Sequence, residues 1–280
     1  MRKLKIVTDS SCTMERVLIN QLEIHIVPLS VIIDDTIYTD NDSLGREEFM
    51  EKMAIAKNLP KTSQPPIGKF VETYDQLGED GSEVLSIHMT TALSGTVEAA
   101  RQAAQLSKTA VTVIDSDTTD QGLSFAVIRA AELAQQGQTL AEVLPVVENV
   151  LAHTKLYIGL SSLDNLVKGG RINRATGMVS SFLNMRVIME LKNAELVPAV
   201  KGRGNKTFSK WFDEFKKELR EVPNLKRIGI SYAGDPVQWQ PYLNDLKNLF
   251  PKVPIAFLHT TPVIATHTGS GAFAIMYYSE

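Results

Sequence analysis

Apolar and polar positions along the first 155 residues switch repeatedly between a strand-like and a helix-like period. Short apolar runs predict strands at residues 4–8, 24–33, 84–88 and 111–114. Apolar residues at helical spacing predict helices at 46–57, at 67–74 and around 99–104, with two more before residue 153. The last of these opens with Thr139 and Glu142, which have capping-box spacing. Strands separated by helices predict an α/β fold with mainly parallel sheets flanked by helices.

The second half begins with a new strand pattern. Strands are expected at 156–160, 228–232, 255–258 and 272–278, with a hairpin of 186–191 and 195–199 around Asn193. Helices are expected at 172–183, 207–220 and 238–249. The strand at Leu156 coincides with a change in charge, so we expect two α/β domains, residues 1–155 and 156–280. No Gly- or Pro-rich linker separates them, which predicts that they pack together.

The charge of the chain is unevenly distributed. Residues 1–167 carry 13 Lys and Arg against 23 Asp and Glu, whereas residues 168–227 carry 14 against 6. The basic stretch is either a solvated face or a docking surface for an acidic partner. Nucleic acid is a poor candidate, because aromatic residues are sparse there and the formal net charge of the chain is −3.

Several function classes lose support from the sequence. No apolar stretch approaches the roughly 18 residues needed to cross a membrane, and no apolar segment follows the basic N-terminus as in a signal peptide. The single Cys12 cannot form an internal disulfide, which favours a reducing cytoplasm. No nucleotide-binding glycine motif and no His pair at metal-ligand spacing occurs, so we expect neither a metal nor a cofactor.

Candidate binding residues follow the predicted strands, where ligands of α/β sheets bind. Ser94 and Gly95 stand at a helix start, where free backbone N–H groups and the positive end of the helix dipole favour an anion. Thr62 and Ser63 precede another helix start. Helix capping alone explains any one such cluster. If the two segments converge, they would hold a carboxylate or phosphate without a metal.

Three further residues carry possible chemistry. His267 lies in a turn of small residues before the last strand, where it is either structural or close to a ligand. Two glycines precede Arg171, which points its charge into the crevice, toward a partner or into solvent. A serine hydrolase using Ser94 is disfavoured, because Ala92 replaces the first Gly of the nucleophile elbow and the base would have to be His267 or His88.

A methionine-rich apolar segment adds a second kind of candidate site. Most of its residues are expected in the core, but methionine also adapts to irregular apolar ligands. A hydrocarbon pocket that ends at hydroxyl donors would suit a fatty acid. The apolar residues concerned are Met178, Val179, Phe182, Leu183, Met185, Val187, Ile188 and Met189.

Seven short motifs together span nearly the whole chain. They are Ile-Val-Thr-Asp-Ser at 6–10, Thr-Ser-Gln-Pro at 62–65, Leu-Ser-Gly-Thr at 93–96, Val-Ile-Asp-Ser at 113–116, Lys-Gly-Gly-Arg-Ile at 168–172, Lys-Gly-Arg-Gly at 201–204 and Thr-His-Thr-Gly at 266–269. In this order they resemble the motifs of the DegV family of bacterial fatty-acid-binding proteins, the FakB-type subunits of fatty acid kinase.

The resemblance implies a DegV-like fold of two domains with a ligand tunnel that reaches the domain junction. A long-chain fatty acid would lie in this tunnel. Its carboxylate would be bound in the motifs that contain Thr62, Ser63, Ser94, Gly95 and His267. Arg171 and Arg203 would lie at the site mouth or at the contact with a partner.

The resemblance also implies a division of labour. The partner would be a separate ATP-using kinase subunit that phosphorylates the bound carboxylate to an acyl phosphate for phospholipid synthesis. This chain would then be a non-catalytic, cytoplasmic subunit with transient membrane contact. Two alternatives stay open: a lipid carrier or sensor without a kinase, and a hydrolase using Ser94. A polar anion at Ser94 is the reading if no lipid binds.

Overall fold

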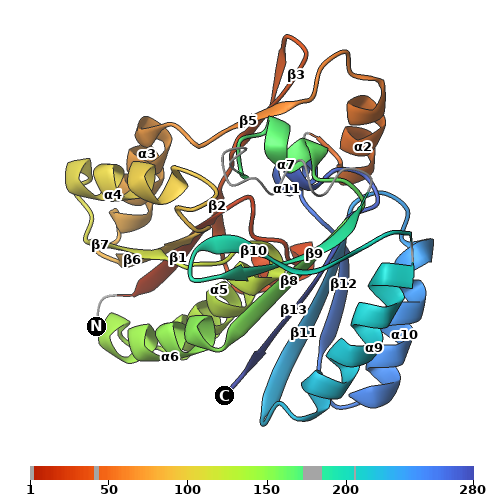
Figure 1. The fold of residues 1–280 in the computed structure, drawn as a ribbon. Coiled ribbons are helices and arrows are strands. Elements are labelled where there is room, and N and C mark those ends of the chain that lie inside the picture. The colour runs from red at the N-terminus through yellow and green to blue at the C-terminus, as the bar shows by residue number, and fades with distance from the viewer. Residues whose placement is uncertain (1–2, 41–43, 173–184, 205) are drawn as a thin grey trace.

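The structure is a computed structural model that describes residues 3–40, 44–172, 185–204 and 206–280. A parallel sheet, a larger mixed sheet and a small projecting sheet are arranged around helices (Figure 1). The predicted helix at 172–183 lies outside the described residues apart from Ile172, and so do Met178, Val179, Phe182 and Leu183.

The N-terminal sheet has the expected parallel architecture. Its order is β2-β1-β6-β7, and each neighbouring pair runs parallel. Helices α3 and α4 cover one face of this sheet and α5 lies on the other. Adjacent strand residues point to opposite faces, so Val7 packs in the apolar cluster of α3 and α4, whereas Ile6 belongs to the cluster that contains α5. The elements are β1 (Leu4–Asp9), β2 (His25–Val27), α3 (Ile67–Gly78), β6 (Glu83–His88), α4 (Thr96–Leu106), β7 (Val111–Asp115), α5 (Asp120–Gln135) and α6 (Leu140–Ala152).

The C-terminal sheet corrects the expectation of mainly parallel sheets. β11 and β12 run parallel, whereas each of its other described pairings is antiparallel. Asn193 and Ala194 have positive φ, which suits a two-residue hairpin turn that folds β10 straight back on β9 without a crossover helix. In sheet order the strands are β10 (Glu195–Gly202), β9 (Arg186–Lys192), β8 (Thr154–Leu160), β13 (Phe273–Ser279), β11 (Leu225–Tyr232) and β12 (Ile255–His259).

Helices cover both faces of this second sheet. Helix α9 (Lys206–Arg220), followed in the chain by a 3-10 turn, η2 (Val237–Trp239), and α10 (Gln240–Leu249), buries an aromatic cluster against one face. Trp211 and Phe273 belong to that cluster. The amphipathic pattern predicted at 207–220 is therefore confirmed as a helix with its aromatic side on the sheet.

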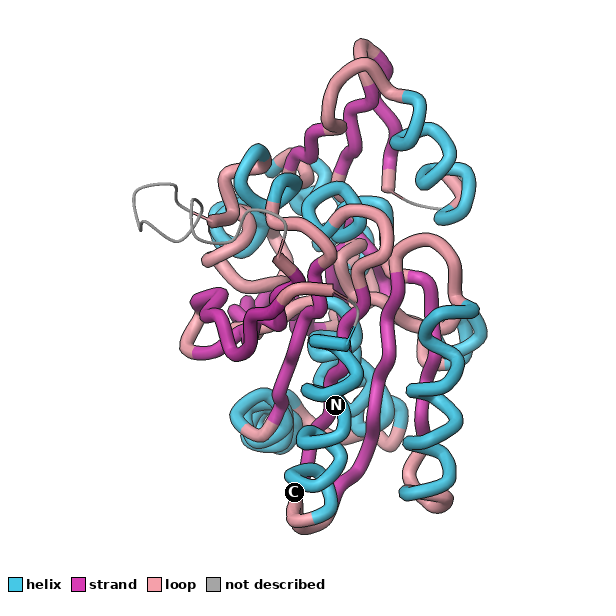
Figure 2. Tube along the Cα trace, turned by 45° about the vertical axis from the view of Figure 1, so that its right-hand side comes forward, coloured by secondary structure: helices cyan, strands magenta, loops and turns pink. Residues whose placement is uncertain are grey.

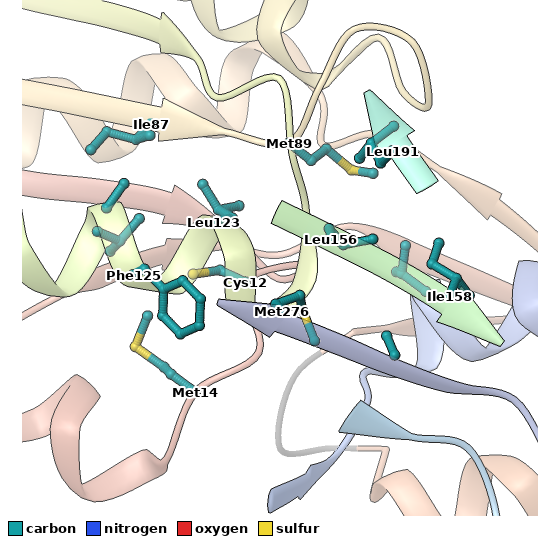
Figure 3. Packing of buried hydrophobic residues seen from close by; sticks show 14 of the residues in the cluster. Cys12, Met14, Ile87, Met89, Leu123, Phe125, Leu156, Ile158, Leu191 and Met276 are labelled. Carbon is teal, nitrogen blue, oxygen red and sulfur yellow. The ribbon is translucent and has the colours of Figure 1, made fainter. Parts of the chain in front are cut away.

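Helix α5 lies between the two sheets. Twelve of its sixteen residues are buried, and it contacts β1 and β6 on one side and β8, β11 and β13 on the other. Figure 3 shows Leu123 of this helix near Ile87 of the first sheet and Leu156 of the second. A helix that is buried on all sides needs apolar or small residues around its whole circumference, which its sequence supplies.

The two-domain division stays a prediction. The boundary at 155/156 falls inside β8, the first strand of the second sheet in chain order. One cluster of buried apolar residues contains members from both sides of it, including Leu123 and Met276. The two parts therefore share a core.

A small antiparallel sheet projects from one end of the molecule (Figures 1 and 2). It contains β3 (Ser30–Ile33), β4 (Thr36–Thr39) and β5 (Lys61–Ser63), and α2 (Arg46–Ile55) follows β4 in the chain. The segment 24–33 thus forms two strands, β2 and β3, in different sheets. Five short elements were not predicted. A helix of less than two turns, or a strand of four residues or fewer, is too short to show a hydrophobic period in the sequence. They are β4, β5, α1 (Arg16–Gln21), α7 (Asp164–Lys168) and α11 (Pro262–Thr268).

Candidate functional site

Four of the predicted site residues meet at one cavity. It encloses about 550 Å³ of space outside the protein atoms, open solvent included. We call it the first cavity. Its polar lining comes from separate parts of the chain: Thr62, Gln64, Ser94, Thr119, Arg171, His267 and Thr268. Its apolar lining includes Leu29, Met89, Leu93, Ile158, Leu166, Leu196, Val263 and Ile264.

Thr62 and His267 are joined directly. The Thr62 Oγ1 and His267 Nε2 atoms lie 2.8 Å apart, although the two residues are 205 positions apart in sequence. β5 places Thr62 by pairing with β3. His267 was expected in a turn, but it lies in the last turn of the short helix α11. This helix ends before Gly269, whose φ is 77°. Glycine adopts a positive φ without steric cost, which suits position 269 at the end of this helix.

The surroundings of His267 determine its protonation. Burial and the nearby charge of Arg171 lower the pKa of His267 to about 3, so the ring is neutral at neutral pH. Its Nδ1 atom is buried without a hydrogen-bond partner among the described residues. That atom lies against Gly169, where an added Cβ would be 2.4 Å away. This close approach is a physical reason for glycine at position 169.

Because the His267 ring is neutral, the hydroxyl hydrogen of Thr62 can be free to bond to a ligand. A proton on Nδ1 of His267 would be a buried donor without an acceptor, so we assign the ring proton to Nε2. Nε2 then donates to Thr62 Oγ1. The Thr62 hydroxyl, which lines the first cavity, keeps its own hydrogen to donate to a ligand.

Arg171 supplies a positive charge that no acidic group balances within the part of the chain that the structure describes. Its Nε donates to the carbonyl oxygen of Leu93 at 3.0 Å, and its Nη1 donates to that of Gly169 at 2.8 Å. Among the described residues, no carboxylate forms an ion pair with it. The guanidinium is half-buried, and burial lowers its pKa, but an arginine stays charged at neutral pH. A half-buried cation held by two carbonyl groups can still accept an anionic ligand.

Ser94 and Gly95 lie at the start of α4, as predicted. The Ser94 hydroxyl lies 2.8 Å from that of Thr96 and accepts a hydrogen bond from the Thr96 backbone N–H at 3.3 Å. Gly95 lies under the side chain of Gln64, whose Oε1 would be 2.1 Å from an added Cβ. The segment before α3 and the start of α4 therefore converge. Gln64 is a lining residue that we had not singled out, although it lies within the Thr-Ser-Gln-Pro motif.

Two predicted residues lie elsewhere. Ser63 neighbours Thr62 on β5, but its side chain is exposed and its hydroxyl donates to the Gln64 carbonyl oxygen at 3.3 Å. Arg203 is exposed and lines a surface groove between β10 and α9. Binding roles for all the predicted site residues stay predictions, because the geometry identifies no ligand.

The geometry gives no support to a hydrolase using Ser94. His267 bonds to Thr62, and no described hydrogen bond joins Ser94 to either candidate base. His88 lies between Ser86 and Asp9, at 2.6 Å and 3.0 Å. Those three side chains have the order of a catalytic triad, but all are fully buried, so a substrate has no access.

A second, apolar cavity adjoins the first. It holds about 330 Å³ of space, and the two share Thr119, Ile158, Ile264 and Thr268 in their linings. Strands β8 and β13 contribute Leu156, Ile158, Phe273 and Ala274 to its wall, and Ala272 lies just before β13. Of the methionine-rich segment, Val187, Ile188 and Met189 are buried in the core, as expected, whereas Met178, Val179, Phe182 and Leu183 lie outside the described residues. Alternating alanines in the last strand are the sequence signal that points to this space.

The described residues contain no group of three His, Cys, Asp or Glu side chains that could hold a metal ion. No helix among them combines the length and the apolar character needed to cross a bilayer. The absence of a cofactor stays a prediction.

Comparison with known proteins agrees with the fold. The model of the family described as "Uncharacterised protein, DegV family" matches residues 3–280. A DegV domain-containing protein of Streptococcus pneumoniae serotype 4 is 52% identical over 276 residues, covering 99% of this chain and 98% of that protein.

Two solved structures share the fold over the full length. A DegV family protein from Thermus thermophilus, described as binding fatty acid, is 30% identical with a TM-score of 0.88 and covers 99% of this chain and 100% of its own. DegV of Bacillus subtilis, described as a fatty acid binding protein, is 27% identical with a TM-score of 0.91, with 100% of each chain covered. The family match across residues 3–280 and the 52% identity show that this chain belongs to the DegV family.

Proposed function

We propose that this protein binds a long-chain fatty acid and presents its carboxylate to a separate ATP-dependent kinase subunit. The observation that carries the lipid part is that two adjoining cavities share four lining residues. The first contains the unbalanced charge of Arg171 and the Thr62 hydroxyl, and the second is almost wholly apolar. The fatty acid binding described for the two structural relatives supports the same ligand class.

The energies are compatible with this ligand. Burying each methylene contributes roughly 0.8 kcal/mol, so a C16 chain offers about 12 kcal/mol before its lost freedom is counted. A buried carboxylate without partners would cancel much of that gain. Thr62, Ser94 and Arg171 supply two hydroxyls and a charge at the end of the cavity that a head group would occupy.

The residues of this chain hold the reactant and do not transfer the phosphoryl group. Arg171 balances the carboxylate charge, and the neutral His267 orients the Thr62 hydroxyl. The exposed side chains of Ser63 and Gln64 place the head-group end of the first cavity near solvent, where a kinase could reach it. The kinase would supply ATP. A carboxylate oxygen would attack its γ-phosphorus, the bond from that phosphorus to the β,γ-bridging oxygen would break, and ADP would leave. The sequence has no phosphate-binding glycine motif of its own.

The proposal is tested by identifying what the protein carries. The purified protein is denatured and extracted with organic solvent, and the extract is analysed by mass spectrometry. We expect a near-stoichiometric long-chain fatty acid. An empty extract, followed by no uptake of added palmitate or oleate, would contradict lipid binding and favour a polar anion at Ser94. A bound lipid that no kinase subunit phosphorylates would favour the carrier or sensor alternative.

The hydroxyl of Thr62 gives a sharper test of the head-group position. Thr62→Val removes the hydroxyl at nearly constant volume, and we expect palmitate affinity to fall about fivefold to tenfold, as for a lost hydrogen bond of about 1 kcal/mol. Thr62→Ser keeps the hydroxyl and should stay within about twofold of the original protein. Calorimetric titration measures both, with thermal unfolding as the check on folding. Equal affinities for all three proteins would remove Thr62 from the site.

A further inference from the structure

A surface groove runs between β10 and α9, separate from the two cavities. Its floor includes Tyr157, Val200 and Trp211. One wall is a stripe of α9 with a side chain at every fourth position, which places them along one side of the helix. In chain order these are Lys206, Lys210, Glu214 and Glu218. The stripe is basic at the beginning of α9 and acidic toward its end, and it extends over about 18 Å.

The basic end of this groove lacks the ion pairs that other α9 lysines make. Lys216 pairs with Asp213 and Asp245, and Lys217 pairs with Glu214. By contrast, no acidic partner among the described residues contacts Lys206, Lys210 or the neighbouring Arg203. Glu218 likewise has no cationic partner there. At its acidic end Glu214 is therefore paired, and Glu218 is the carboxylate without an ion pair among the described residues, opposite the unpaired Lys206 and Lys210.

We propose that this groove docks a helical segment of a partner protein that carries acidic residues at one end and basic residues at the other. The inference rests on the proposed function, because the partner that needs such a surface is the kinase subunit. Opposite charges at matching positions favour the correct encounter and disfavour others. A membrane surface or a nucleic acid is a uniform polyanion, which the unpaired Glu218 at the acidic end of the groove would repel.

The strand that forms the other wall favours a helix over an added strand. β10 lies at the edge of the six-stranded sheet. Pro198 has no N–H to donate, and the pairing register of β10 shifts between Pro198 and Val200. Both features weaken β10 as a template for strand addition. A helix of about three turns instead matches the length of the charged stripe and would lie over the apolar floor.

Charge reversal at both ends distinguishes the possible occupants. The purified protein is titrated with the purified kinase subunit encoded in the same genome, at low and at raised salt. We expect Lys206→Glu combined with Lys210→Glu to weaken binding at least tenfold, and Glu218→Lys to weaken it about threefold. Lys247→Glu combined with Lys252→Glu changes the net charge equally at exposed positions outside the groove, and should stay within about twofold.

The sign of the Glu218→Lys effect is decisive. A polyanionic occupant would bind that variant more tightly, and the same titration with phosphatidylglycerol vesicles would then show Lys206-dependent binding. Either result overturns the proposal, as would equal losses in the two double variants or no binding of the kinase by the original protein. Fatty acid retention is measured on every variant. If the original protein retained no fatty acid, the proposed function itself would be contradicted. If it retains fatty acid but the kinase-binding results fail, only the proposed role of the groove is contradicted.

Discussion

Replacing Arg171 by glutamine is expected to lower the affinity for palmitate between about 10-fold and 100-fold. This corresponds to the roughly 1.5–3 kcal/mol of a hydrogen bond to a charged group, and it is the largest single contribution that the first cavity offers. The guanidinium is half-buried and has no described acidic partner, so its loss leaves the carboxylate without a balancing charge. Calorimetric titration at neutral pH measures the effect.

A neutral ligand separates this charge effect from a packing effect. Methyl palmitate has the same hydrocarbon chain but no carboxylate, so the original protein and the Arg171→Gln variant should bind it equally. Arg171→Lys keeps the charge but loses the planar fork that bonds to Leu93 and Gly169. Its affinity for palmitate should lie between those of the original protein and the Arg171→Gln variant. If the variant lost palmitate and methyl palmitate to the same extent, Arg171 would be a structural residue only.

Replacing Gly169 by alanine is also expected to weaken palmitate binding, although glycine has no side chain that could contact the ligand. The added Cβ would meet Nδ1 of His267 at 2.4 Å and the backbone oxygen of Asn165 at 2.9 Å. The imidazole must then move, and its 2.8 Å contact with Thr62 is lost. We expect about a tenfold loss of palmitate affinity and a melting temperature lower by a few degrees, as for overpacking by about 1–2 kcal/mol.

The matched control is another Gly→Ala change with free space around it. Gly68 lies in α3, where an added Cβ meets nothing within 4 Å. Gly68→Ala should leave palmitate affinity unchanged and raise the stability slightly, by about 0.5–1 kcal/mol, since alanine is the better helix former. If Gly169→Ala bound palmitate as well as Gly68→Ala does, the position of the His267 ring would be irrelevant to the ligand.

Much of the fold could be predicted, because its long elements have clear periods. The parallel sheet, the Asn193 hairpin and the amphipathic α9 follow directly from the sequence pattern. The antiparallel arrangement of the C-terminal sheet could not be predicted, since buried strands read alike in both directions. Short elements such as β5 and α11 were also missed, and these two carry Thr62 and His267.

The members of the site were predictable, but their contacts were not. Motif resemblance selected Thr62, Ser94, Arg171 and His267, and the fold brings all four to one cavity. The 2.8 Å contact between Thr62 and His267 joins parts of the chain 205 residues apart, so no local pattern encodes it. The role of Gly169 depends on that same long-range packing.

The central position of α5 bears on how this chain folds. One helix supplies apolar surface to both sheets, so neither sheet can complete its core unless the other is present. A gene fragment cut at residue 155 would keep the helix but uncover the side that faces β8, β11 and β13. The two halves are therefore expected to unfold in a single cooperative transition, and the bipartite architecture does not consist of independently stable modules.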